Sequence, residues 1–232
     1  MFGNLIYYDK KKIDQYSALM TGKIRENNEN TKKIADESIQ YLFECEQFER
    51  LLQQREDYFD FVGLNQDMSI KDVRIASIVR VTGEIFVPEK FDLVNFIEEY
   101  KPLIVSGMQF QDEDEKKLIN EVLSNSKIKI PIFCELDAEC DYWLGIGKVS
   151  KDNLLVDYNE LEDLEGKELT IIAKIDSRKY YKDKPLQVFD IYKDFLGLNR
   201  ALRKEIAVKK DNEFESIEVE EDYLGLELLA IY

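Results

Sequence analysis

The spacing of hydrophobic residues is helical in the first part of the chain and strand-like beyond residue 70. Apolar positions three to five residues apart predict helices over residues 10–20 and 34–54. Asp9 is suited to cap the first of these helices and Gly22 to end it. A short strand over 5–8 is expected before the first helix. The polar, Asn-rich stretch 23–30 predicts the loop between the two helices.

From Val73 onward, apolar residues recur at every second position, as in a half-buried strand. The pattern predicts a hairpin over 73–87, with Thr82-Gly83 as its turn and Pro88 at its end. Further strands are expected over residues 128–135, 142–149, 153–156, 168–175 and 224–232. Helical spacing predicts short helices over 92–100, 112–123 and 189–203, and the acidic stretch 211–222 is expected to be loose.

Strands and helices alternate too irregularly for repeated βαβ units, so the sequence predicts an α+β fold. It has a helical N-terminal part and a β-rich second half, which would form a meander or a small barrel and end in a buried C-terminal strand. Residues 1–66 would hold the first strand and helices. Residues 67–232 would form the mixed region, packed with the first part as one unit.

Composition excludes several kinds of chemistry. The 232 residues include 48 acidic and 32 basic side chains, a net charge of −16, and no histidine. Serine–histidine and cysteine–histidine catalysis, histidine metal sites and a histidine pH switch are therefore excluded. The sequence identifies no catalytic residue and no cofactor. Its acidity disfavours binding to nucleic acid phosphates.

The chain has no apolar run long enough to span a bilayer and no basic segment ahead of its first apolar stretch. We therefore expect neither a membrane partner nor a signal peptide. Its three cysteines form an odd set, typical of reduced thiols rather than a disulfide framework. These features predict a cytoplasmic protein, and a homo-oligomer is compatible with them.

Three segments resemble an uncharacterised bacterial family, one of the domains of unknown function. They are the opening Leu5–Asp9 with the Ile13 to Gly22 pattern after it, the stretch Leu161–Ile175, and the terminal Leu229–Tyr232. The resemblance implies a bacterial, cytoplasmic origin and genes carried with mobile or defence islands. It supplies no catalytic residues.

Two segments have the composition of a ligand site but the wrong spacing. Cys134–Asp141 holds two thiols and four carboxylates, yet its cysteines are too far apart for a zinc knuckle and no second pair exists. We interpret it as a strand end, an acidic turn and a return strand, with no metal. Gly145-Ile146-Gly147-Lys148 lacks the spacing and the Ser/Thr of a phosphate loop, and it is interpreted as part of a strand.

A basic segment with interleaved aromatic residues is the candidate anion-binding site: Arg178, Lys179, Tyr180, Tyr181 and Lys182. Lysine or arginine next to tyrosine is typical of nucleic-acid contacts. A solvated loop explains the same composition, and Asp176 and Asp183 offset part of its charge.

The acidic residues cluster in two stretches, with 11 acids against 3 bases over 131–168 and seven acids with no base over 211–222. A helical turn is predicted over 159–165, with Leu161 and Leu164 buried and four carboxylates in water: Glu160, Glu162, Asp163 and Glu165. These four form the candidate partner-binding site, because a basic partner would relieve their mutual repulsion.

Together these features predict a non-enzymatic interaction or regulatory accessory protein of bacteria, in a mobile-element or phage-defence setting. Its expected partner is a protein with a basic surface. Two alternatives stay open. One is an acidic mimic of nucleic acid that inhibits a DNA-binding enzyme, and the other is a histidine-free enzyme that holds a metal with carboxylates.

Overall fold

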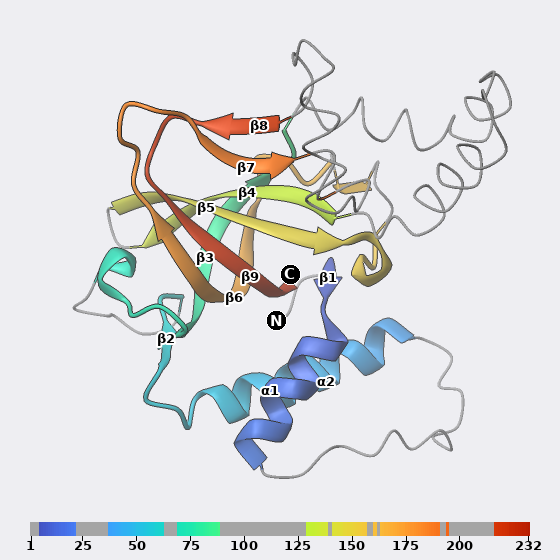
Figure 1. Cartoon of the computed structure of the whole chain (residues 1–232). Coiled ribbons are helices and arrows are strands. Elements are labelled where there is room, and N and C mark those ends of the chain that lie inside the picture. Colours follow the sequence, from blue (N-terminus) through green and yellow to red (C-terminus); the bar gives the residue numbers. More distant parts are fainter. Residues whose placement is uncertain are drawn as a thin grey trace, which may run out of the picture. The chain divides into compact units, whose positions relative to one another are not determined.

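The computed structural model describes residues 5–21, 37–62, 69–88, 129–138, 141–156, 160–161, 163–190, 194 and 216–232 (Figure 1). Its helices are α1 (Lys10–Thr21) and α2 (Glu37–Leu52), with the single 3₁₀ turns η1 (Ile70–Asp72) and η2 (Lys151–Asn153). Its strands are β1 (Tyr7–Tyr8), β2 (Tyr58–Asp60), β3 (Ile78–Phe86), β4 (Lys129–Ala138), β5 (Asp141–Ser150), β6 (Glu168–Lys179), β7 (Leu186–Asp190), β8 (Ser216–Val219) and β9 (Tyr223–Ile231).

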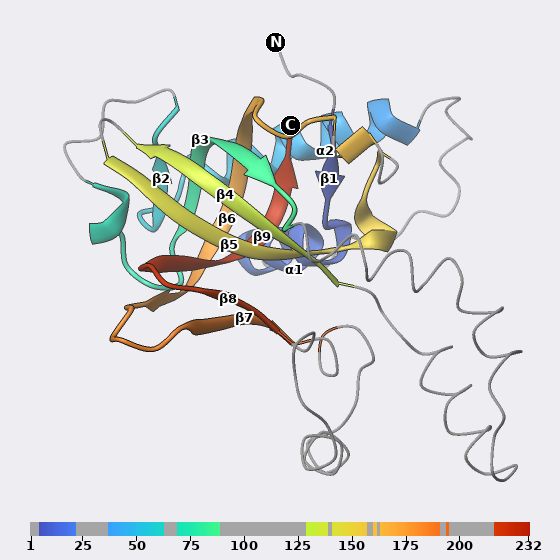
Figure 2. The same ribbon diagram turned by 90° about the horizontal axis from the view of Figure 1, so that it is seen from above.

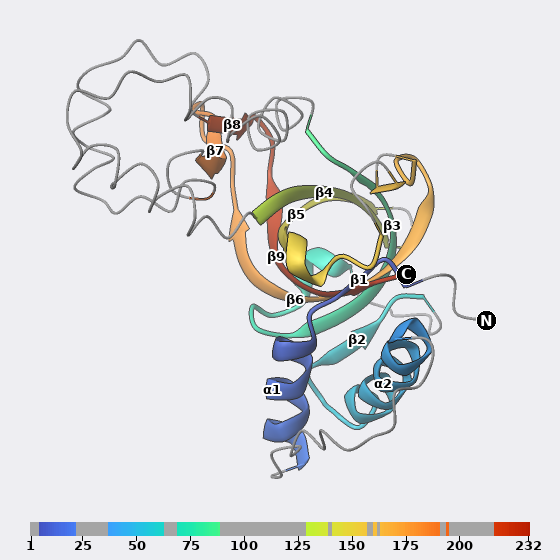
Figure 3. The ribbon, with the colours of Figure 1, turned by 90° about the vertical axis from the view of Figure 1, so that its right-hand side faces the viewer.

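Five strands close into a barrel. β3 pairs with β4, β4 lies beside β5, β5 pairs with β9, β9 with β6, and β6 returns to β3. Figure 3 shows this ring nearly end on. The β5–β9 pair is parallel, whereas β3–β4, β3–β6 and β6–β9 are antiparallel. Around the ring, the first strand in the chain neighbours the second, the second the third, the third the fifth, the fifth the fourth, and the fourth the first. This is the Greek-key connectivity of an OB-fold barrel.

The chain divides into two compact units. The first unit comprises residues 1–86, 132–180 and 222–232, and the second comprises 87–131 and 181–221. The second unit is therefore made of two insertions into the barrel chain. Each insertion interrupts a pair of strands: Phe86 is the register partner of Phe133, and Lys179 is the partner of Tyr223. Among the described residues, the second unit contains the antiparallel pair β7–β8.

The barrel interior is filled by alternate residues of its strands. Val79 and Val81 of β3 lie opposite Ala173 and Ile171 of β6, and all four are fully buried. A Cβ atom added at Gly83 would lie 2.7 Å from the carbonyl oxygen of Glu135. Glycine therefore permits the close approach of β3 and β4 at this point.

The helices cover the outside of the barrel wall formed by β3, β6 and β9. Figure 3 shows α1 and α2 on one side of the ring. A second apolar cluster fills the space beneath them and includes Ile13, Phe48 and Leu52 from the helices and Ile172 and Leu229 from the strands. The Asp9 carboxylate caps α1 by accepting from the Lys12 backbone N–H at 3.1 Å, as the sequence predicted.

The predicted α+β class with a helical N-terminal part is wrong. The described chain is mostly β, and its two helices lie outside a barrel that begins at Ile78. Short strands within the supposedly helical part join the same sheet: β1 pairs with β9, and β2 pairs in parallel with β3. The strand expected over 5–8 is present as β1, but its pairing with β9 could not be predicted, and the three residues of β2 carry almost no periodic pattern.

The hairpin expected over 73–87 is also wrong. β3 runs without a turn through Thr82-Gly83, and only residues 74–77 turn, with Ala76 at φ 74°. The strand expected over 153–156 is reduced to one bridge between Leu154 and Tyr7. Ile217 lies in β8, within the stretch expected to be loose, and Phe189 lies in β7, where a helix was expected to start.

Several predicted elements occur close to their expected positions. β4, β5, β6 and β9 match four expected strands, and β9 is buried along nearly its whole length. The expected loop 23–30, the expected helices 92–100 and 112–123, and the boundary between residues 66 and 67 lie outside the described residues. No described helix is long and apolar enough to cross a membrane.

Candidate partner-binding surface

Three glutamates lie side by side across three adjacent strands of the barrel. Glu84 of β3 is the register partner of Glu168 on β6 and of Glu135 on β4. Directly opposite residues of antiparallel strands project from the same face, with Cβ atoms about 4.5–5.5 Å apart. All three side chains are exposed. We call this row the glutamate ladder.

The ladder lies on the outside of the barrel. Gly83 and Ile85, which flank Glu84 on β3, are buried, so the alternation of the strand places Glu84 on the opposite face. Cys134 and Leu136 flank Glu135 in the same way and are also fully buried. β3, β4 and β5 can be followed from above in Figure 2.

No cation of the described residues pairs with the ladder, because no ion pair or side-chain hydrogen bond among them involves the carboxylates of Glu84, Glu135 or Glu168. Like charges directly opposite each other destabilise a sheet. Folding therefore gains nothing from this arrangement, and a bound positive group would relieve the repulsion.

An aromatic pair continues the same face by one step along β3 and β4. Phe86 lies opposite Phe133, and their rings meet edge to face with centroids 5.7 Å apart. Both side chains are half-buried. The face therefore combines carboxylates with apolar rings, and this combination suits the alkyl stems and charged heads of lysine and arginine.

The predicted acidic turn leads directly into the ladder. Leu161 is buried, with 1 % of its surface exposed, and its carbonyl accepts from the Leu164 N–H at 3.1 Å. The turn ends at Gly166, with φ 70°, two residues before the ladder. Of the predicted partner-binding residues, Glu160, Asp163 and Glu165 are exposed, whereas Glu162 lies outside the described residues.

The predicted anion-binding residues lie at the other end of β6, where Arg178 and Lys179 are its last two residues. Tyr180 and Tyr181 are 55 % and 37 % exposed, and Lys179 and Lys182 are exposed. Arg178 instead turns inward, and its guanidinium donates to the backbone carbonyl of Val73. This contact ties β6 to the segment that precedes β3, so Arg178 supports the fold and the other four residues form an exposed basic and aromatic segment.

The structure separates the groups of the Cys134–Asp141 segment. Cys134 faces the barrel interior, and complete burial raises the pKa of its thiol to about 12. Glu135 points outward, so the two side chains do not converge on one ion. The described residues contain no group of three acidic or cysteine side chains placed to hold a metal. Cys140 lies outside the described residues.

The glycines of the supposed phosphate loop lie inside β5. A Cβ atom added at Gly145 would be 2.6 Å from the Leu226 side chain, and one at Gly147 would be 2.5 Å from Leu228. Both glycines therefore give room to leucines of the neighbouring strand β9, as expected for glycines within a strand.

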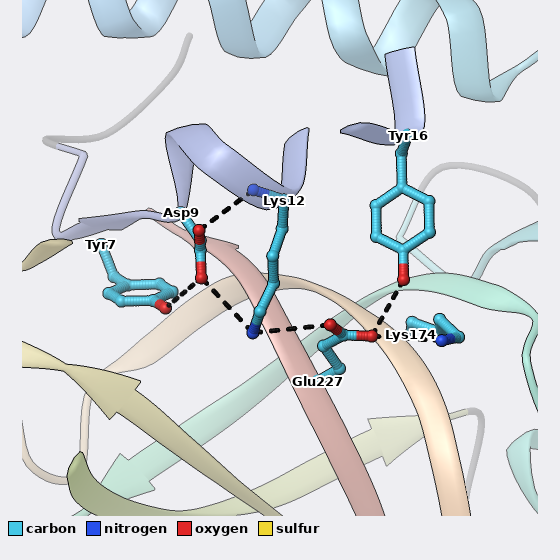
Figure 4. A network of polar contacts seen from close by, with 6 residues as sticks. All are labelled: Tyr7, Asp9, Lys12, Tyr16, Lys174 and Glu227. Atoms are coloured by element: carbon cyan, nitrogen blue, oxygen red, sulfur yellow. Dashed lines mark hydrogen bonds and ion pairs between the residues drawn. The ribbon is translucent and has the colours of Figure 1, made fainter. Parts of the chain in front are cut away.

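A polar network fixes α1 to the barrel (Figure 4). Glu227 of β9 accepts from the Tyr16 hydroxyl at 2.9 Å and lies 3.2 Å from the Lys174 ammonium. Lys12 bridges Glu227, at 3.6 Å, and Asp9, at 3.3 Å. Desolvation opposes the charge of Glu227, but the Tyr16 and Lys174 contacts outweigh it and lower the pKa of this carboxyl. Every group of this network is paired within it. The network therefore accounts for the attachment of α1 to the barrel and not for a chemical reaction.

A second network joins α2 to the barrel through Arg80 of β3. Its Nη1 lies 3.2 Å from Asp60 of β2, and its Nε donates to the Tyr232 hydroxyl at 3.0 Å. That hydroxyl donates to Glu49 of α2 at 2.5 Å. Glu49 and Asp60 are each only 8 % exposed. We call these four residues the Arg80 cluster.

The class of protein is thus a closed OB-like barrel with two insertions, an acidic outer face and two external helices. The chain belongs to the family described as domain of unknown function DUF6414, which matches residues 20–232. This confirms the resemblance to an uncharacterised domain family, and two of the three motifs behind it lie within the match. No curated protein and no solved structure matches the chain.

Proposed function

We propose that this chain is a non-enzymatic interaction protein that binds a basic segment of a partner protein across the glutamate ladder. The observation that carries the proposal is the register of the ladder: three exposed carboxylates on three neighbouring strands, without a described cation to balance them. The half-buried pair Phe86–Phe133 beside it supplies apolar contact area.

OB-fold barrels use the outer face of their second and third strands to bind oligonucleotides or oligosaccharides. In this chain the second strand is β4, and it contributes Glu135 to that face. Carboxylates repel phosphates, so the charge of this wall favours lysine and arginine over a nucleic acid backbone. The bacterial mobile-element or defence setting implied by the family resemblance forms part of the proposal.

The proposal is tested with a fluorescent peptide rich in lysine and arginine, titrated with the full chain at low and at high salt. The ladder variant replaces Glu84, Glu135 and Glu168 with glutamine. The matched control replaces three exposed carboxylates elsewhere on the first unit, Glu56→Gln, Asp72→Asn and Asp176→Asn, so both variants lose the same net charge.

We expect wild type and control to bind the peptide alike, with an affinity that falls as salt rises, and the ladder variant to lose about tenfold or more. Equal losses in both variants would show that only net charge matters and would contradict the proposal. A single-stranded DNA of similar length is expected not to bind. Tight binding of DNA in place of the peptide would overturn the proposed partner class.

A further inference from the structure

The Arg80 cluster contains one carboxylate that the guanidinium leaves only loosely paired. Arg80 approaches both oxygens of Asp60, at 3.2 and 3.3 Å, but its nearest approach to Glu49 is 3.7 Å. Glu49 receives its short hydrogen bond, 2.5 Å, from the neutral hydroxyl of Tyr232. Glu49 is therefore a nearly buried carboxylate whose ion pair with Arg80, at 3.7 Å, is longer than that of Asp60.

The surroundings of Glu49 add little positive charge. β2 contributes Asp60 and Tyr58, β3 contributes Arg80, and the end of β9 contributes Tyr232. Its own helix contributes Glu46 and Cys45. On α1, Lys10 lies 3.6 Å from Glu44, and Lys12 pairs with Asp9 and Glu227. Two of these neighbours are acidic, so they disfavour a second negative charge.

We propose that the Arg80 cluster is a proton-operated clasp, in which uptake of one proton by Glu49 tightens the attachment of α2 to the barrel and its loss loosens it. A neutral carboxylic acid at Glu49 needs no cation, and it can still accept the Tyr232 hydrogen bond. An ionised Glu49 must instead compete with Asp60 for the single guanidinium of Arg80.

The electrostatics support the direction of this effect. Desolvation by burial raises the pKa of Glu49 above its ordinary value of 4.5, although Tyr232 and Arg80 partly oppose the rise. A carboxyl whose pKa is raised in the folded state stabilises that state below its unfolded pKa. The stabilisation is lost as the pH rises through the folded pKa. Opening of α2 should therefore become more frequent as the pH rises out of the acidic range.

The proposed clasp is separate from the glutamate ladder, so a negative result for the clasp would leave the proposed function untouched. It concerns how α2 covers the apolar cluster that contains Cys45, Phe48 and Leu52. Local opening of one helix is measurable independently of global unfolding by amide hydrogen exchange.

The test measures hydrogen exchange of peptides from α2 in the full chain from about pH 4.5 to about pH 8, corrected for intrinsic exchange. In the wild type, the opening constant of α2 should increase with pH, by about tenfold for each unit by which the pKa is raised. Glu49→Gln mimics the protonated state, so α2 should stay closed at every pH. Glu56→Gln, a matched change at an exposed residue just beyond the helix, should keep the wild-type profile.

A second variant guards against a purely structural effect of glutamine. Tyr232→Phe removes the hydroxyl that stabilises ionised Glu49, so the rise in opening should extend to higher pH and become larger. The proposal is overturned if Glu49→Gln retains the pH dependence, or if it opens more readily than wild type at neutral pH. An unmoved profile in Tyr232→Phe would equally contradict it.

Discussion

Removing the central charge of the glutamate ladder should make the protein more stable. Glu84 faces a like charge on each side, Glu168 and Glu135, whereas each of these two has one such neighbour in the ladder. Two unit charges about 5 Å apart in water repel by about 0.8 kcal/mol. Favourable cross-strand pairs contribute about 0.2–1 kcal/mol, and like charges directly opposite each other are destabilising. Glu84→Gln removes two such pairs and Glu168→Gln removes one.

At low salt we therefore expect Glu84→Gln to increase the free energy of unfolding by about 0.5–1.5 kcal/mol, and Glu168→Gln by about half as much. For a chain of this size, 1 kcal/mol corresponds to about 2–4 °C in the melting temperature. The gain should shrink at high salt, because exposed charges are screened.

The assay is urea unfolding at two ionic strengths, compared with Glu56→Gln, which removes an exposed charge outside the ladder. The reasoning fails if Glu84→Gln gives no gain, or no more than Glu168→Gln, or if its gain is independent of salt. A gain in stability together with a loss of peptide affinity would show that the ladder is kept for binding rather than for folding.

Three further outcomes are expected. Deleting Leu224–Tyr232 should give insoluble or unfolded protein by circular dichroism, because β9 pairs with β1, β5 and β6; an unchanged melting curve would contradict this. Replacing residues 87–131 and 181–221 by short Asn-Gly turns should leave a first unit that melts cooperatively, because each insertion starts and ends beside paired strands. The near-ultraviolet signal of Trp143 monitors this melting, and loss of that signal would count against the prediction. Elemental analysis should find no stoichiometric zinc, since Cys134 is buried in the barrel and Glu135 faces outward; about one zinc per chain would refute this.

Local sequence patterns predicted the individual elements better than their assembly. The positions of β4, β5, β6 and β9 follow from alternation of apolar residues, and the start of α1 follows from Asp9. Which strands become neighbours depends on contacts between distant residues. The closure of β3 against β6, more than 80 residues later, leaves no local trace.

Gly83 illustrates why the turn predicted from the local sequence was wrong. A Thr-Gly pair between two alternating stretches is typical of a turn. In the structure, the glycine is required by the approach of the Glu135 carbonyl, and β3 continues through it. A glycine needed for close packing and a glycine needed for a turn have the same sequence signature.

The candidate site was found only in part from the sequence. The acidic turn before Gly166 was visible as a run of carboxylates, and the structure exposes its described members beside the start of β6. The ladder was not visible, because Glu84, Glu135 and Glu168 are far apart in the chain and become neighbours only through strand register. A correct prediction of the β3 pairings would have revealed it.

The most direct test of the proposed function is a chemical-shift titration of the isotope-labelled full chain with the lysine- and arginine-rich peptide. The account predicts that the largest amide shifts fall on residues 82–86 of β3, on 133–136 of β4 and at the start of β6. Shifts confined to residues 178–182, or spread evenly over the acidic surface, would contradict it.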